Sequence, residues 1–173
     1  MPKPLFLGSL SASAESDWER EQPGSDVWVM RSVGKKYAAI MDRDMKNYEE
    51  FDLRDIGNVI FVGGNSRSSV GFRVWARNEL LKQDQWYYAA SINSHLRGRN
   101  ETALYLYSPA GNPATVHTDG IECAWMNFDQ ADLIAVDGVS YVTIESLEVW
   151  GSGSSAVGGG NMKIGRASCR ERV

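Results

Sequence analysis

The sequence predicts a mainly β protein, in which an antiparallel β module is followed by closely spaced short strands. Apolar segments rich in Val, Ile and aromatic residues recur about every 10 to 15 residues, which is typical of strands. Gly, Ser, Asp and Pro separate these segments, and long helical patterns are rare. In the last third of the chain the apolar segments lie too close together for helices to fit between them.

The first expected strand, at 4–8, lies in a lead-in section that we place at 1–25. A hairpin should follow, with strands at 27–30 and 37–41 on either side of a turn at 33–36. The acidic stretch 42–55 fits a short helix or an irregular loop equally well.

The antiparallel module is expected to span 26–117. Its later strands are predicted at 58–62, 71–76, 85–89 and 103–107, with one helical turn near 78–82. Leucine and tyrosine alternate in the last of these strands, which indicates one buried face and one partly solvated face. Pro and Gly at 108–113 then fit tight turns.

The section 118–163 is expected to begin a parallel β-helix. Its strands are predicted at 133–136, 141–144 and 147–150, with Asp137-Gly138 as a turn. In such a fold, the inward side chains of each coil stack on those of the next coil. Because one coil alone leaves strand edges unpaired, we also expect the chain to self-associate.

The last ten residues, 164–173, differ from everything before them. Their sequence, IGRASCRERV, resembles the translation of a common sequencing adapter, as would arise at the end of a library insert. We therefore expect this tail to be non-native, and the natural protein to continue beyond about Lys163.

Composition excludes some classes of partner. The net charge is −4, and no cluster of Lys and Arg predicts a nucleic-acid surface. No apolar run approaches the ~20 residues that a membrane-spanning helix needs. The N-terminus also lacks the layout of a signal peptide.

The sequence offers few candidates for catalysis, for metal ligands or for cofactors. Cys123 is expected to be a small buried apolar residue, and Cys169 lies in the tail. Gly151 to Ala156 match a dinucleotide fingerprint loosely, but the glycines that follow are a poor helix start. The acids in 42–44 and at Asp129, Asp132 and Asp137 are expected in turns, and His95 and His117 in exposed loops. We assign no catalytic residue, cofactor or metal ligand to this chain.

Tryptophan is the one residue type that points to a ligand, because sugar rings stack on exposed aromatic faces. Trp150 ends the last predicted strand, ahead of a Gly/Ser loop, and is the candidate substrate-binding residue. Four others lie inside apolar runs and are expected in the core: Trp28, Trp75, Trp86 and Trp125. Asn100-Glu101-Thr102 also fits a glycosylation sequon.

Several motifs occur together in a characteristic order. They are Gln85-Trp86-Tyr87-Tyr88, the run 103–109 with Asn112-Pro113, Gly120-Ile121-Glu122, and the run 140–149. This order resembles right-handed parallel β-helix proteins of the pectate-lyase-like superfamily, over about residues 18–160. The stretch 93–100 departs from the pattern, since it is longer and more basic than expected.

The resemblance implies an extracellular or cell-surface protein that acts on polysaccharides, as a lyase or a glycoside hydrolase. It implies Ca²⁺ in the parent protein if that protein is a lyase, because carboxylate oxygens suit this ion. It places the active site beyond this chain, so we expect the chain itself to be inactive. The alternatives are a non-catalytic glycan-binding or adhesive protein and a structural β-solenoid.

Overall fold

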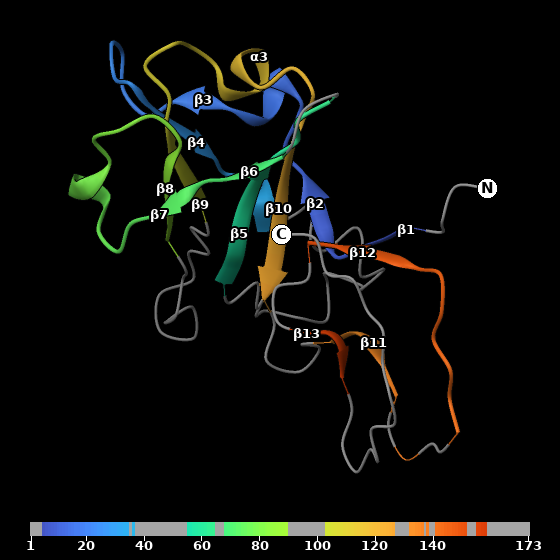
Figure 1. Cartoon of the computed structure of the whole chain (residues 1–173). Helices are drawn as coiled ribbons and strands as arrows, with labels where there is room; N and C mark the ends of the chain where they lie inside the picture. The colour runs from blue at the N-terminus through green and yellow to red at the C-terminus, as the bar shows by residue number, and fades with distance from the viewer. Residues whose placement is uncertain are drawn as a thin grey trace.

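The computed structural model describes residues 5–34, 36, 55–64, 68–89, 103–126, 132–136, 138, 141–151 and 155–158. Within these residues the strands form two larger sheets and two isolated parallel pairs (Figure 1). The predictions of a mainly β fold and of antiparallel sheets are confirmed. The described strands do not close into a parallel β-helix.

The first sheet has the strand order β2-β10-β5-β6. Its strands are β2 (Ser9–Ser11), β10 (Ile121–Met126), β5 (Asp55–Phe61) and β6 (Ser69–Val70). All three pairings are antiparallel. Gly57 has no partner across β10, because Trp125 pairs with Ile56 and Ala124 with Asn58. This bulge shifts the alternation of β5, so that Ile56 and Val59 both reach the core.

The second sheet has the order β3-β4-β9-β8-β7. Its strands are β3 (Glu19–Arg20), β4 (Val27–Met30), β9 (Ala103–Tyr107), β8 (Gln85–Ala89) and β7 (Phe72–Arg73). The pairings are antiparallel except for β7, which runs parallel to β8.

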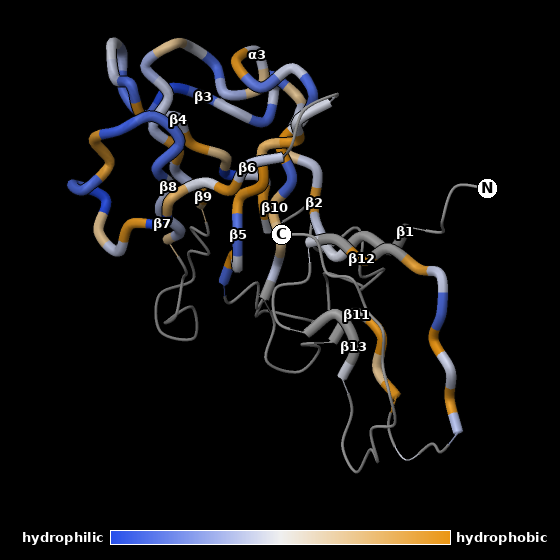
Figure 2. Tube along the Cα trace, viewed as in Figure 1, coloured by the Kyte–Doolittle hydropathy of each residue, from blue (hydrophilic) through white to orange (hydrophobic). Residues whose placement is uncertain are grey.

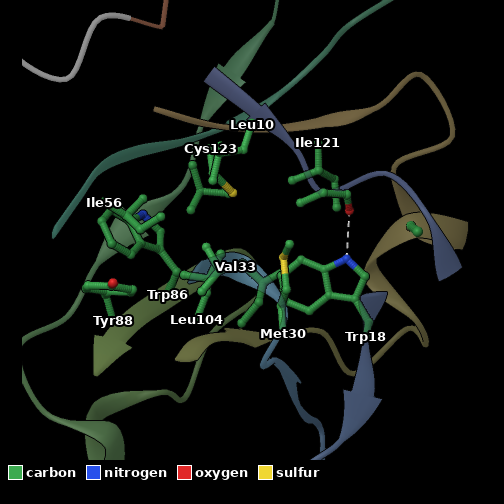
Figure 3. Packing of buried hydrophobic residues seen from close by; sticks show 14 of the residues in the cluster. Leu10, Trp18, Met30, Val33, Ile56, Trp86, Tyr88, Leu104, Ile121 and Cys123 are labelled. Carbon is green, nitrogen blue, oxygen red and sulfur yellow. Dashed lines mark hydrogen bonds between the residues drawn. The ribbon is translucent and has the colours of Figure 1, made fainter. Parts of the chain in front are cut away.

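The main core lies between the two sheets (Figure 3). The first sheet contributes Leu10, Ile56, Val59, Phe61, Ile121 and Cys123, and the second contributes Met30, Trp86, Tyr88, Leu104 and Leu106. Figure 2 shows hydrophobic residues along β10, whereas β3 at the sheet edge is hydrophilic. Burial of Cys123 confirms its prediction, and this burial raises the thiol pKa to about 12.

A second, smaller core covers the other face of the five-stranded sheet. Val29, Ala103 and Tyr105 point to this face, and Val74 and Leu80 cover them from the connection between β7 and β8. The alternation of leucine and tyrosine in β9 therefore separates two apolar environments, since Tyr105 is also buried.

Short helical turns also occur in the described chain, among them η1 (Glu15–Asp17), η2 (Arg77–Glu79) and α3 (Pro113–Val116). The sequence prediction missed α3, whose Asn112 side chain accepts the Ala114 N–H at 3.0 Å. Asn112 thus acts as the N-cap, and Pro113 suits the first helical position because its missing N–H is not needed there.

The remaining strands form two parallel pairs. β1 (Leu5–Leu7) pairs with β12 (Glu148–Trp150), and β11 (Asp132–Ala135) pairs with β13 (Ser155–Gly158). β1 leads directly into β2 through the buried Gly8. A Cβ on Gly151 would lie 2.9 Å from the Ser9 Cβ, so the end of β12 passes close to β2.

Three predictions on strands need correction. The predicted hairpin is wrong because β4 pairs on its two sides with β3 and β9, and Lys36 N–H donates to Ser32 O in a helical turn. The segment 141–144 forms no strand, and Tyr141 is fully exposed with φ at 62°. Residues 121–126 belong to the section 118–163 that was expected to begin a β-helix, but they form a strand that pairs antiparallel with both of its neighbours in the first sheet.

Several predictions lie outside the described residues. They concern the strand at 37–41, the acidic stretch at 42–54, His95, the sequon at 100–102, Asp129, Asp137 and the tail at 164–173.

We expect Leu104→Ala to lower the free energy of unfolding by about 2–5 kcal/mol, because Leu104 is fully buried between the sheets. The measurement is urea unfolding followed by circular dichroism. Leu81→Ala is the matched control, since Leu81 is 70% exposed and should change stability by less than about 0.5 kcal/mol. If both substitutions lowered the free energy of unfolding equally, the placement of Leu104 in the core would be contradicted.

Candidate functional site

The candidate site is built around Arg73, at the end of β7. Its guanidinium forms two hydrogen bonds with the Asp55 carboxylate, Nη1 to Oδ2 and Nη2 to Oδ1, each 2.8 Å long. Nη1 also donates to the Ile56 carbonyl at 3.3 Å. Two parallel hydrogen bonds fix the plane of the guanidinium as well as its position.

Arg73 also contacts two tryptophans. Its Cζ is 5.1 Å from the ring centroid of Trp86 and 4.2 Å from that of Trp75. Trp86 is buried in the main core, whereas Trp75 is 76% exposed. The three side chains therefore form a stack in which Arg73 links a buried ring to an exposed one, with a cation–π contact to each.

The backbone of Trp75 is fixed as well. The Glu79 carboxylate accepts the N–H groups of Trp75 and Ala76, at 3.1 and 3.2 Å. Val74, the preceding residue, is buried in the second core. An exposed indole is thus held by its neighbours at both the ring and the main chain.

The position of the stack depends on Gly71. β6 pairs with β5 and β7 pairs with β8, so the chain crosses from one sheet to the other between Val70 and Phe72. The Trp86 indole donates to the Gly71 carbonyl at 3.1 Å. A Cβ on Gly71 would lie 2.8 Å from Trp86 Cδ1 and 2.9 Å from the Asp84 carbonyl oxygen, so only glycine fits here without a shift.

The charges around the stack are paired. Arg73 is neutralised by Asp55, and Arg77 forms an ion pair with Glu21. Burial, and to a smaller extent the Asp55 charge, raises the pKa of Tyr88, so this phenol stays neutral. The site therefore offers an aromatic surface bordered by a fixed, mutually compensated carboxylate and guanidinium.

His117 is not the exposed loop residue that the sequence predicts. Its ring stacks on Phe61, with centroids 4.0 Å apart, and Nε2 lies 2.9 Å from Asp84 Oδ1. Asp84 has φ at 65° and bonds through its backbone to both Tyr107 and Phe72. The histidine thus ties the turn after α3 to the turn before β8, and these contacts suit a structural role.

A second polar group lies where β1 and β12 meet the first sheet. The Ser9 hydroxyl donates to Glu122 Oε2 at 2.9 Å, and Lys36 donates to the Ser11 carbonyl at 2.9 Å. Burial raises the pKa of Glu122, although the Ser9 hydrogen bond and the Lys36 charge act in the opposite direction. A half-buried carboxyl with a raised pKa is a reasonable candidate for an acid, but Ser9 and Lys36 already occupy its surroundings.

The tryptophans expected in the core are not all there. Trp86 is buried and Trp28 and Trp125 are partly buried against the core, but the prediction is wrong for Trp75. The backbone of Trp150 ends β12, and its side chain lies outside the described part. Trp75 was missed because it follows Val74 in an apolar run. The exposure of Trp75 could have been inferred from its position, because it follows the short strand Phe72-Arg73 and lies just before the polar turn at 77–79.

Other candidates receive no support as sites. Residues 155–158, which begin within the last two positions of the loose dinucleotide fingerprint, form a strand where that motif needs a helix. In the described ranges, no three side chains of His, Cys, Asp or Glu are close enough to hold a metal ion. No helix in the described part of the chain is both long and apolar enough to cross a membrane.

Comparison with models of protein families, with curated protein sequences and with solved structures gave no match.

We predict that Glu122→Gln stabilises the fold more at about pH 7 than at about pH 4. The raised pKa means that the folded chain holds this proton more tightly than the unfolded chain does. The stability of the unmodified chain should therefore fall as the pH rises from the ordinary carboxyl pKa through the raised one. Glutamine keeps the acceptor for Ser9 but cannot ionise.

The measurement is the urea midpoint of both chains at the two pH values. Glu145→Gln, at an exposed position, controls for the loss of one negative charge. If Glu122→Gln instead raised the urea midpoint more at about pH 4 than at about pH 7, the described burial of the Glu122 carboxyl would be contradicted.

Proposed function

We propose that this chain belongs to a right-handed parallel β-helix protein that acts on polysaccharides, and that its antiparallel sheets are inserted in the first coil of that helix. The observation that carries the proposal is the pairing of the four strands outside the two larger sheets. Both pairings are parallel. The two earlier strands, β1 and β11, pair in chain order with the two later strands, β12 and β13.

The register of β11 and β13 supports a coil. Asp132 pairs with Ser155, Ile134 with Val157 and Ala135 with Gly158, so every residue pairs with the one 23 positions later. Parallel strands need a long connection, which is usually a helix. Here the described part of the connection contains a strand, β12, that itself pairs in parallel. A connection of this length matches one repeat of a solenoid, which spans about 20–45 residues.

The pairing of β1 with β12 supports the insertion. Leu5 pairs with Glu148, 143 positions later, whereas the other pair is 23 positions apart. The difference of 120 residues is close to the length of the segment 8–126, which holds both antiparallel sheets. One coil would then contain β1 and β11, and the next coil would contain β12 and β13.

Two features favour polysaccharides as the ligand. The motifs at 85–88, 103–109 and 140–149 resemble those of pectate-lyase-like proteins, which act on such polymers as lyases or hydrolases. In addition, Trp75 presents an exposed aromatic surface beside fixed polar groups, a combination that suits a sugar ring. We propose that the chain binds the polymer and that the reaction takes place elsewhere in the parent protein.

The test is native gel electrophoresis of the full chain through gels that contain xylan, galactomannan, mixed-linkage β-glucan or polygalacturonate. We expect at least one polymer to retard the chain, while serum albumin runs unchanged. We also expect no new reducing ends and no unsaturated uronate after long incubation. Absence of retardation in all four gels would refute the function, and turnover would refute the division between binding and reaction.

A further inference from the structure

The Trp75 side chain is highly exposed, yet its neighbours hold it in place. An indole that is 76% exposed leaves a large apolar area in water, which gives no stability to the fold. Yet one side of the ring rests on Arg73, and Glu79 holds the backbone at Trp75 and Ala76. A rigid aromatic side chain binds a ligand at a small entropic cost, because its few rotatable bonds are already fixed.

The support below the ring is also rigid. Arg73 is fixed by the two hydrogen bonds to Asp55, and its guanidinium also contacts Trp86, which is 1% exposed. Trp86 in turn is held by its hydrogen bond to Gly71. The orientation of Trp75 is therefore set by the main core of the protein.

The surface around Trp75 suits a small polar ligand better than an apolar protein surface. Phe72 is also exposed, but Phe72 and Arg73 are adjacent residues of one strand, so their side chains point to opposite faces. Next to the Trp75 ring lies Arg73, which is paired with Asp55, and these two side chains are 22% and 26% exposed. One aromatic face bordered by a hydrogen-bond acceptor and donor matches a pyranose, which has an apolar C–H face and hydroxyl groups at its rim.

The charges select among sugars. Asp55 compensates the charge of Arg73, and Glu21 compensates that of Arg77. Within the described part of the chain, the two arginines of this site are therefore both paired, while Glu79 adds a negative charge. These observations favour a neutral sugar unit.

We infer that Trp75, backed by the Arg73–Asp55 ion pair, is a binding platform for a neutral pyranose unit of a polysaccharide chain. This inference rests on the proposed polysaccharide function and assigns it to one surface of the antiparallel sheets.

The test compares the full chain with Trp75→Ala, Trp75→Phe and Leu81→Ala by affinity electrophoresis in xylan, galactomannan, β-glucan and polygalacturonate. We expect the unmodified chain to bind a neutral polymer, and Trp75→Ala to weaken this binding by about tenfold or more. Trp75→Phe should keep part of the affinity, because a phenyl ring also stacks. Leu81→Ala removes an equally exposed apolar side chain and should change the affinity less than about twofold.

The outcomes separate the two proposals. If no polymer binds the unmodified chain, both the function and the platform are refuted. If a neutral polymer binds Trp75→Ala as well as the unmodified chain, the function stands and the platform is refuted. If only polygalacturonate binds, with an affinity that falls steeply with salt, the neutral ligand is refuted. The unfolding midpoint of Trp75→Ala should match that of the unmodified chain, which excludes misfolding as the cause of lost affinity.

Discussion

Five residues, Ser69 to Arg73, connect the two large sheets along one side. Their first half pairs with β5 and their second half with β8, so the chain must pass between the sheets within one residue. Gly71 meets this constraint because it has no side chain where Trp86, Asp84 and Phe61 approach. The crossing also places Arg73 against the buried Trp86. Through Arg73, this contact also supports the exposed ring of Trp75.

The stack of Trp86, Arg73 and Trp75 turns a buried core into an ordered surface. Each cation–π contact contributes only about 0.5–1 kcal/mol at exposed sites. The ion pair with Asp55 adds less stability than its two hydrogen bonds suggest, because both side chains are about three-quarters buried and the cost of removing the charges from water offsets much of their attraction. The effect of these contacts is mainly geometric: they fix an indole that would otherwise sample several rotamers.

Much of the fold could be predicted from local sequence patterns, and the predictions that failed have a common cause. The strands at 85–89 and 103–107 were predicted because their alternation reflects two faces that differ in environment. The partner of a strand is not encoded locally, which is why the hairpin at 27–41 was wrong and why 121–126 was assigned to the wrong section. Trp75 was misplaced for a related reason, since an apolar run does not show where the covering sheet ends.

The candidate site was harder to predict than the fold. Asp55, Arg73 and Trp86 lie on three strands, and the sequence gives no sign that their side chains meet. Trp150 was expected to bind sugar for the same physical reason, since an aromatic ring exposed at the end of a strand can stack on a sugar ring. What distinguishes Trp75 is the pair of supports, Arg73 and Glu79, which only the folded chain brings together.

The most direct test of this account is nuclear magnetic resonance of the indole N–H groups during titration with a neutral oligosaccharide such as xylohexaose or mannohexaose. Signals of the six tryptophans can be separated, and the Trp75→Phe variant assigns the one that matters. We expect the Trp75 signal to shift with saturation, whereas the Trp86 signal stays in place because its N–H is bonded to Gly71 in the core. Saturable binding of either oligosaccharide with no change in the Trp75 signal would contradict it.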